Sequence, residues 1–497
     1  MRKLMTRSAG AALLVAVLAL TGCSSSSDYN SGGPKSGSGQ GGPGDAPQIP
    51  GGETAVGEHA QSTFALDVDT ASYAYALRQL HDGRWPERST VRPEEFVNSF
   101  DMDYGQPKGD GFALHVDGSA MPSTHRSQYN DRLRLVRIGL QTRGEDAETR
   151  PDVALTFVID VSGSMAETGR LDLVQDALHY LVRQLRRTDS VALVTFNERA
   201  KMVLPMTRLS QVEDLDRAID SLSAGGSTNL ESGLVTGYQV ARDGFRQGSS
   251  NRVILLSDGL ANVGNTESSP ILRRVKAEAD KEISLLGVGV GSNYGDELME
   301  KLADQGDGFA VYVADRNQAR DVFVHRLPAN LSVRALDAKA QVTFDEATVE
   351  AYRLVGYDDR LLSASEFRDD RVDGGEVGPG HAVTALYIVR LRPEVRSSAK
   401  VADVRVRWQD PASRAASEAY ESIMVNDLAG SFRSADPHLR VAYAAAFFAE
   451  ALKSSSYAAE VQLDQLRQIA ADAQEELRDA KVGELADAIR TASRLRG

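Results

Sequence analysis

The amino-acid sequence predicts an α/β protein in which a doubly wound domain with a parallel sheet is flanked by an antiparallel β-sandwich and a C-terminal helical subdomain. Between Val153 and about Leu327, runs that are apolar along their whole length alternate with helical segments. This pattern is typical of a parallel sheet covered on both faces. Residues 330–425 instead hold short alternating segments without clear helices between them, which favours an antiparallel sandwich.

The first 23 residues are predicted to be an export signal rather than part of the fold. A basic start, MRKLMTR, precedes an apolar stretch over residues 9–20 that is too short for an ordinary membrane span. The stretch ends in Leu-Thr-Gly-Cys, which resembles a bacterial lipobox. Because Cys23 is the only cysteine of the chain, no internal disulfide is available. We expect cleavage before Cys23, its lipidation, and anchoring of the exported protein to the membrane of the bacterial cell envelope.

The segment from 24 to 60 is rich in Ser, Gly and Pro and has little to bury. It is predicted to be a flexible tether. After it, FALDVD alternates as a strand does, and Thr70 or Ser72 is placed to cap a helix over ASYAYALRQLHDG. Asp67 and Asp69 fit either a metal site or a strand that leads into a capped helix. The second interpretation is favoured because it needs no ion.

Two further segments, FALHVDG and LRLVRIGLQT, have the period and residue types of strands. We expect both to join the sandwich that follows the α/β domain. The α/β domain would then be an insertion between strands of the sandwich.

The α/β domain is expected to open with the strand VALTFVID and a helix whose apolar residues recur from Leu171 to Leu185. SVALVTF, a short edge-like KMVLPM, and helices beginning at Ser210 and Asn229 follow. The remaining strands are RVILLSD, ISLLGVGVG and FAVYVA, separated by helices, and the last helix ends near Leu327.

The C-terminal part is expected to be helical, because Asp436 can cap a helix and Pro437 suits its first turn. Alanine-rich helices then continue to the end as a packed subdomain. The chain is therefore expected to divide into a lipoprotein signal peptide (1–23), a tether (24–60), an N-terminal flanking region that contributes strands to the sandwich (61–150), the α/β domain (151–328), the sandwich region (329–428) and the helical subdomain (429–497).

Polar residues end two of the predicted parallel strands and occupy a loop between them. Asp160, Ser162 and Ser164 form D-x-S-x-S after the first strand, Asp258 ends a later one, and Thr228 lies in a glycine-rich turn before a helix. Ligands of open α/β sheets bind just beyond the carboxyl ends of the strands. Hydroxyls and only two carboxylates suit Mg²⁺ or Mn²⁺ with an open position, rather than a fully caged Ca²⁺. A carboxylate from outside the chain can then complete the coordination shell of the ion.

The motifs DVSGSM, GGSTN and LLSDG, in this order, resemble the metal-ion-dependent adhesion site of von Willebrand factor type A (VWA) domains. The resemblance implies a Rossmann-like VWA fold. It also implies that Ser162, Ser164 and Thr228 are direct or switchable ligands, that Asp160 and Asp258 act largely through water, and that an acidic side chain of a protein partner binds the ion.

The flanking segments STFALDVDTASYAYALRQL, VEAYRLVGYDDRLL and GEVGPGHAVTALYIV are similar to those of YfbK-type VWA lipoproteins of bacteria. Together with the VWA motifs they cover most of the chain that follows the signal peptide. The resemblance implies an architecture and names no partner.

Several other functions are disfavoured. The net charge of −14 and the low aromatic content of 6% argue against a nucleic-acid partner. The glycines of GVGVGSNYG, Gly287 to Gly295, do not have dinucleotide-loop spacing, so no nucleotide is expected. H-E-x-x-H and G-x-S-x-G motifs are absent, and the motif serines lack a nearby sequence candidate for a base. The chain is therefore not expected to be an enzyme.

The expected function is metal-dependent adhesion or protein–protein interaction at the envelope, with Mg²⁺ or Mn²⁺ as the ion and Ca²⁺ as the alternative. Two other interpretations stay open. The ion stiffens the loops of a scaffold for an envelope complex, or, less favoured, acts as the Lewis acid of a metal-dependent hydrolase.

Overall fold

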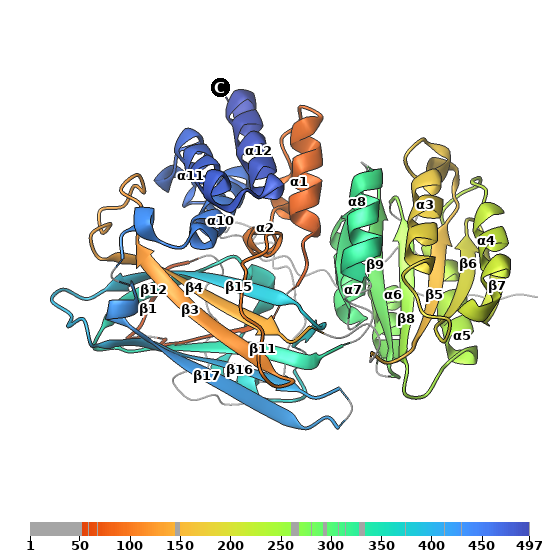
Figure 1. The fold of residues 1–497 in the computed structure, drawn as a ribbon, viewed down its shortest axis with the longest axis horizontal. Helices are drawn as coiled ribbons and strands as arrows, with labels where there is room; N and C mark the ends of the chain where they lie inside the picture. The colour runs from red at the N-terminus through yellow and green to blue at the C-terminus, as the bar shows by residue number, and fades with distance from the viewer. Residues whose placement is uncertain are drawn as a thin grey trace, which may run out of the picture. The chain divides into compact units, whose positions relative to one another are not determined.

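A computed structural model, shown as a ribbon in Figure 1, describes residues 52–496 except 58, 67, 145–149, 260–267, 280, 292–295, 307, 314, 328–332, 373, 412 and 429. The predictions made for the signal peptide, for Cys23, for the tether up to residue 51 and for Asp67 lie outside these residues. None of the helices that are described combines the length and the apolar character needed to cross a membrane.

The α/β domain contains a six-stranded sheet in the order β10-β9-β8-β5-β6-β7. Its first five strands in this order are parallel, whereas the edge strand β7 runs antiparallel to β6. The predicted parallel sheet is therefore confirmed except at this edge. The strands are β5 (Val153–Asp160), β6 (Ser190–Phe196), β7 (Ala200–Arg208), β8 (Ser250–Ser257), β9 (Ile283–Val290) and β10 (Ala310–Val313).

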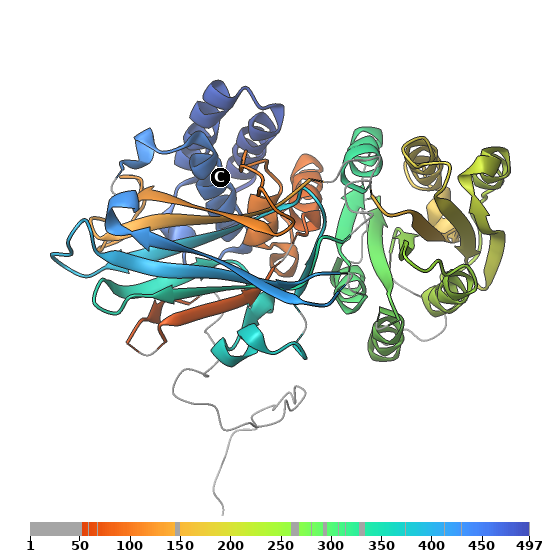
Figure 2. The same cartoon turned by 60° about the horizontal axis from the view of Figure 1, so that its bottom comes forward.

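Helices cover both faces of this sheet, as Figure 2 shows. They are α3 (Leu171–Val182), α4 (Val212–Asp220), α5 (Leu230–Asp243), α6 (Ser268–Ala279), α7 (Asp296–Gln305) and α8 (Arg316–Arg320), which continues into a π-helical turn (Asp321–Arg326). Alternate residues of β5 enter different cores: Leu155 and Phe157 pack with α3 and α4, and Val158 packs with α5. Every residue of β5 is buried, which explains why this strand reads as a continuous apolar run.

The sandwich consists of two antiparallel sheets with the orders β1-β12-β15-β4-β3 and β13-β2-β11-β16-β17, and β14 pairs with β11. The first sheet contains β1 (Thr54–Ala55), β3 (Phe112–Ala120), β4 (Leu133–Thr142), β12 (Val349–Val355) and β15 (Ala382–Leu391). The second contains β2 (Gln61–Ala65), β11 (Ala335–Phe344), β13 (Leu361–Leu362), β16 (Lys400–Gln409) and β17 (Ala416–Met424), beside β14 (Gly375–Val377).

The predicted insertion of the α/β domain is confirmed by the pairing of β4 with β15. Residues 133–141 pair with residues 382–390 in an unbroken register, although the whole α/β domain lies between them in the sequence. FALHVDG also belongs to the sandwich, because β3 pairs with β4 along its length.

A helical layer packs on the outer face of the first sheet. It comprises α1 (Ala71–His81), α2 (Pro93–Asn98), α10 (Pro437–Lys453), α11 (Leu463–Leu477) and α12 (Ala480–Arg496), which share one apolar core with Leu135 of β4 and Leu386 of β15. The predicted start of the C-terminal helices is confirmed, since Asp436 accepts a capping hydrogen bond from the His438 N–H at 2.8 Å and Pro437 begins the helix.

Three details of the N-terminal flank differ from or refine the expectation. The predicted tether ends before residue 60, because Thr54–Ala55 form β1, which pairs with β12, and Val56 is buried. Thr70 immediately precedes α1, but its side chain makes no capping hydrogen bond to the helix. Asp69 is buried, accepts a hydrogen bond from the Ala310 N–H at 2.9 Å and lies 3.8 Å from the Arg360 guanidinium. These contacts give Asp69 a structural role that needs no ion.

Candidate metal centre

The carboxyl edge of the α/β sheet brings the predicted polar residues to neighbouring loops. Asp160 is the last residue of β5, and Asp258 directly follows β8, the strand that pairs with β5 in parallel. Thr228 precedes α5 by two residues. The loop with Ser162 and Ser164 is tied to the Thr228 loop by two backbone hydrogen bonds, from Gly163 N–H to Gly226 O and from Gly225 N–H to Val161 O, each 2.8 Å long.

Asp160 lies at the base of the site and is fully buried. Its Oδ1 accepts a hydrogen bond from the Ser162 N–H at 2.8 Å, and its Oδ2 accepts one from the Ser257 hydroxyl at 2.7 Å. Burial raises the pKa of the Asp160 carboxyl, and the negative charge of Asp258 adds to the rise, while the hydrogen bonds oppose it. A cation at this edge would offset the same cost of a buried negative charge.

The hydroxyls of the site form a chain that ends on Asp258. Ser162 Oγ lies 3.1 Å from Ser164 Oγ, and the Ser164 hydroxyl donates to Asp258 Oδ1 at 2.9 Å. Ser162, Thr228 and Asp258 are buried, whereas Ser164 is exposed. The site therefore opens to solvent at Ser164.

Arg170 is a member of the site that sequence reasoning missed. Its side chain is buried, its Nη1 contacts Asp258 Oδ2 and donates to Ser164 O at 3.0 Å, and its Nη2 lies 2.8 Å from the carboxylate of exposed Glu167. Ser257, which holds Asp160, was also missed. Arg170 belongs to no motif that names a ligand. Ser257 lies in the LLSDG motif, but the motif points to its aspartate and gives the serine no role.

The Thr228 loop is shaped by a glycine and fixed by Asn197. Gly226 has a φ of +89°, and a Cβ at this position would lie 2.7 Å from Glu198 Oε1. Asn197 Nδ2 donates to Gly225 O at 2.9 Å, and its own carbonyl accepts from the Asn229 N–H at 2.8 Å. Asn229 then caps α5 through Ser232 N–H. These bonds hold the loop in place before any ligand arrives.

The donor set fits a hard divalent cation with open coordination positions. Among the described residues, no group of three or more His, Cys, Asp or Glu side chains is placed to hold a metal. Two carboxylates and three hydroxyls are oxygen donors of the kind that Mg²⁺ and Mn²⁺ prefer. Both Asp258 oxygens already have partners in Ser164 and Arg170, so an ion would compete with the guanidinium for this carboxylate.

Three family models match the chain. "von Willebrand factor type A domain" matches residues 154–325, "Uncharacterized protein YfbK, C-terminal" matches residues 329–495, and "von Willebrand factor" matches residues 51–137. The chain is 32% identical over 448 residues to "Uncharacterized protein YfbK" of Escherichia coli, covering 85% of this chain and 76% of that protein.

Other relatives match the chain over shorter stretches. The chain is 26% identical over 190 residues to "Uncharacterized protein sll0103" of Synechocystis, which covers 38% of this chain and 44% of that protein. Inter-alpha-trypsin inhibitor heavy chain H2 of Homo sapiens is 28% identical over 31% of this chain and 17% of its own length. A solved von Willebrand factor type A protein from Catenulispora acidiphila has a TM-score of 0.45 and 18% identity, covering 76% of this chain and 89% of that one.

Proposed function

Because the chain belongs to the YfbK family of proteins with a von Willebrand factor type A domain, we propose that it is an envelope-anchored protein that uses a divalent cation at this site to bind the acidic side chain of a protein partner. A VWA domain is typical of protein–protein interaction. The metal, the adhesion and the lipid anchor are the proposed parts.

The observation that supports the proposal is that three neighbouring loops at the carboxyl edge of the sheet carry oxygen donors, and that the Ser164 loop is hydrogen-bonded to the Thr228 loop and to Asp258. Ser162, Ser164 and Thr228 supply hydroxyls, and Asp160 and Asp258 supply two negative charges. Two carboxylates balance a divalent charge without exceeding it, so an ion that keeps an open position would attract a further carboxylate from outside. Ser164 is the exposed member, so the partner would approach there.

Direct titration tests the metal. Calorimetric titration of the detergent-solubilised full chain with Mg²⁺ and with Mn²⁺ should give saturable binding, and Ser164→Ala and Asp160→Ala should each abolish it. Glu213→Gln is the matched control because it removes an exposed carboxylate on α4, outside the site. Saturable binding that survives both site substitutions would place the ion elsewhere.

Affinity capture tests the adhesion. The full chain serves as bait for an envelope extract in Mg²⁺, in EDTA, and as Asp160→Ala. Proteins retained by the wild type in Mg²⁺, and lost in the other two conditions, would be the partners of the site. If metal binds in the titration but the same proteins are retained under all conditions, the ion has only a structural role in a scaffold.

The anchor is proposed at Cys23, on the strength of the lipobox-like Leu-Thr-Gly-Cys in the sequence. Cells fed an alkyne-tagged fatty acid should label the wild-type protein, and Cys23→Ala should remove the label and release the protein from the membrane fraction. An unlabelled wild type would exclude the lipid anchor and leave the metal site unaffected.

A further inference from the structure

A strand edge of the sandwich is open to a partner. β3 is the last strand of its sheet and pairs only with β4 among the described strands. The N–H of Ala120 points away from β4, to Gly430 O at 2.9 Å. Because backbone groups alternate along a strand and the register is unbroken, the N–H and C=O groups of Leu114 and Val116 also point away from β4.

The open part of this edge is short and bounded. At its beginning, the space beside Gly111 is filled by the Trp408 ring, since a Cβ there would lie 2.4 Å from Trp408 Cζ2. At its end, Leu428 packs on Gly118 and Gly430 pairs with Ala120. Residues 113–117 remain between these limits. A bound segment of about five residues fits this length, because a strand rises about 3.3 Å per residue.

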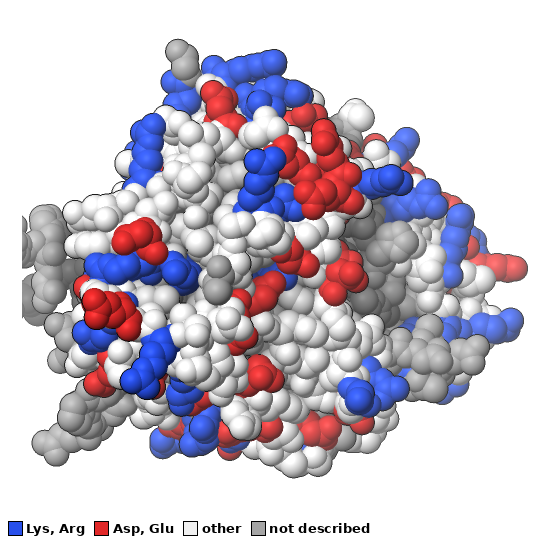
Figure 3. Space-filling view, turned by 60° about the vertical axis from the view of Figure 1, so that its left-hand side comes forward, with Lys and Arg blue, Asp and Glu red and all other residues white. Residues whose placement is uncertain are grey.

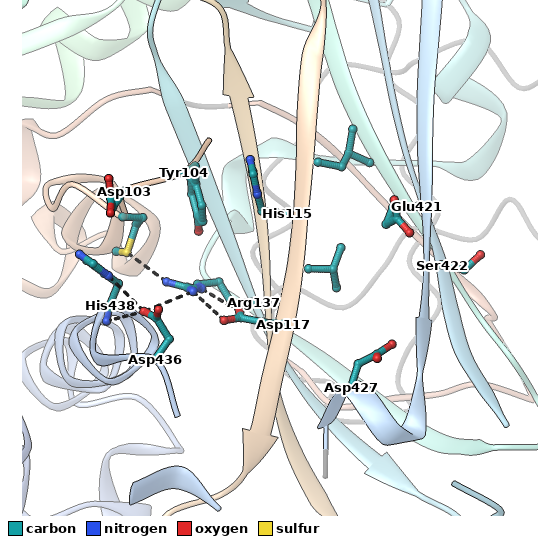
Figure 4. Close-up of a pocket in the computed structure, with 13 residues that line it drawn as sticks. Asp103, Tyr104, His115, Asp117, Arg137, Glu421, Ser422, Asp427, Asp436 and His438 are labelled. Carbon is teal, nitrogen blue, oxygen red and sulfur yellow. Dashed lines mark hydrogen bonds and ion pairs between the residues drawn. The ribbon is translucent and has the colours of Figure 1, made fainter. Parts of the chain in front are cut away.

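A cavity of about 520 Å³ surrounds the same stretch and is lined from both faces of β3. Figure 4 shows Tyr104, His115 and Arg137 on one side of the strand and Glu421 and Ser422 of β17 on the other. A peptide that adds to the edge sends alternate side chains to opposite faces of the sheet. Both sets of side chains would therefore meet lining residues.

The wall of the cavity on the side of Tyr104 and His115 is a rigid aromatic surface. The Tyr104 and His115 rings stack with centroids 5.1 Å apart and an interplanar angle of 9°. The Tyr104 hydroxyl is 3.0 Å from Thr384 Oγ1, and His115 Nε2 is 2.7 Å from Gly105 O. Tyr104 lies so close to β4 that a Cβ on Gly139 would fall 2.2 Å from its ring. The Arg137 guanidinium already lies over the Tyr104 ring, 5.4 Å from its centroid, so this surface is one that contacts a cationic side chain.

The charge of the lining selects the partner. Carboxylates outnumber guanidinium groups by five to one; they are Asp103, Asp117, Glu421, Asp427 and Asp436. The single cation, Arg137, already donates to Asp117 at 2.8 and 2.6 Å and lies 3.5 Å from Asp436. His438 and Arg137 hold the pKa of Asp436 at about 2, so this carboxylate stays ionised. Within the cavity lining, Arg137 forms ion pairs with Asp117 and Asp436 and with neither Glu421 nor Asp103.

We propose that the edge of β3 binds an extended segment of a partner protein that carries lysine or arginine side chains. Its backbone pairs with Leu114 and Val116. Its basic side chains reach Glu421 on one face and the Tyr104–His115 stack with Asp103 on the other. The tether over residues 24–51 does not fit this role, because it contains one lysine, two aspartates and several prolines.

The test uses three labelled seven-residue probes with the detergent-solubilised full chain, read by fluorescence anisotropy in EDTA. The first probe, TRVVKVT, is basic and places its Arg and Lys on opposite faces of an extended strand. The second, TEVVEVT, is acidic, and the third is the basic probe N-methylated at alternate peptide nitrogens. We expect the basic probe to bind, the acidic probe not to bind, and N-methylation to weaken binding at least tenfold because it removes backbone pairing.

Two substitutions locate the binding. Glu421→Lys should weaken binding of the basic probe about tenfold, because an attraction becomes a repulsion. Glu346→Lys makes the same charge change at an exposed position outside the cavity and should leave binding of this probe unchanged. Val116→Pro removes the Val116 N–H, which points away from β4, and should also weaken binding of the basic probe. Thermal unfolding checks that each variant is folded.

Three results would overturn the proposal: equal binding of the N-methylated probe, equal binding by Glu421→Lys and Glu346→Lys, or no binding of the basic probe at 1 mM. Because the assay contains EDTA, its outcome is independent of the proposed metal site.

Discussion

The change Arg170→Gln should tighten Mg²⁺ binding rather than weaken it. Arg170 contacts Asp258 Oδ2 and donates to Ser164 O, so its positive charge lies next to two of the proposed ligands. An incoming divalent ion is repelled by this charge and must also share Asp258 with it. Removing the guanidinium removes both effects and leaves the oxygen donors in place.

The magnitude follows from Coulomb's law. Two unit charges about 5 Å apart interact by about 3 kcal/mol at an effective dielectric constant of about 20. Water at exposed Ser164 reduces the repulsion, while the double charge of the ion increases it. We therefore expect a net gain of about 1.5–3 kcal/mol, which is roughly a 10- to 150-fold fall in the Mg²⁺ dissociation constant.

Calorimetric titration of wild type, Arg170→Gln and Arg170→Lys measures this effect. The lysine variant keeps the charge, so its dissociation constant should stay near that of the wild type. Arg217→Gln, an exposed arginine of α4 that pairs with Asp214, controls for the loss of one positive charge from the protein. Unchanged or weaker binding by Arg170→Gln would refute the reasoning and show that Arg170 mainly positions the Ser164 loop.

Three further predictions concern stability, measured by urea unfolding. Ser257→Ala removes the hydroxyl that donates to fully buried Asp160 Oδ2, and we expect a loss of about 1–3 kcal/mol, which Ser257→Thr should partly restore. Arg353→Met leaves Glu450 buried without the cation that lies 2.9 Å from it; it should cost about 3–5 kcal/mol, and the further change Glu450→Met should recover most of the loss. Burial, with Glu450 and Glu53, raises the pKa of Glu460 to about 7. Because the folded-state pKa exceeds the usual value of about 4.5, the folded state binds more protons than the unfolded state between about pH 4.5 and pH 7. The free energy of unfolding therefore falls as the pH rises through this range. The wild type should therefore lose stability relative to Glu460→Gln between pH 5 and pH 8, and parallel pH profiles would contradict this.

The surface of the molecule carries side chains of both charges. Figure 3 shows one face of the molecule, on which Lys and Arg side chains are interspersed with Asp and Glu side chains. A phosphate backbone binds where basic side chains form a continuous patch or stripe. That the chain has no nucleic-acid partner stays a prediction, which rests on the net charge of −14.

The fold was predictable from the sequence because each layer leaves a distinct periodic signal. β5 is buried on both faces and reads as a continuous apolar run, whereas β17 is mostly exposed and reads as alternating. The direction of β7 was not predictable, because an edge strand has the same composition whether it runs parallel or antiparallel to its neighbour. The pairing of β4 with β15 was predictable only because the strands before and after the α/β domain shared one pattern.

The candidate site was predictable to the extent that strand ends determine it. Asp160 and Asp258 follow adjacent parallel strands, so their proximity is a consequence of topology. Arg170 enters the site from the first residue before α3, and nothing in Gly-Arg-Leu distinguishes it from any helix start. The Tyr104–His115 surface escaped notice for a similar reason: it depends on Gly139, which is distant in sequence and becomes a neighbour only when β4 pairs with β3.

The two proposed surfaces have opposite chemical selectivity, and this makes them separable in one experiment. The VWA edge would bind acidic groups through a cation, so chelation should abolish its binding. The β3 edge would bind basic segments through carboxylates and backbone pairing, so chelation should leave it unchanged while added salt weakens its charge–charge component. Capture in EDTA at low salt should therefore retain only partners with exposed basic segments, and Glu421→Lys should release them. Partners that survive EDTA, high salt and Glu421→Lys together would bind neither surface, and both proposals would then fail to explain the interactions of this chain.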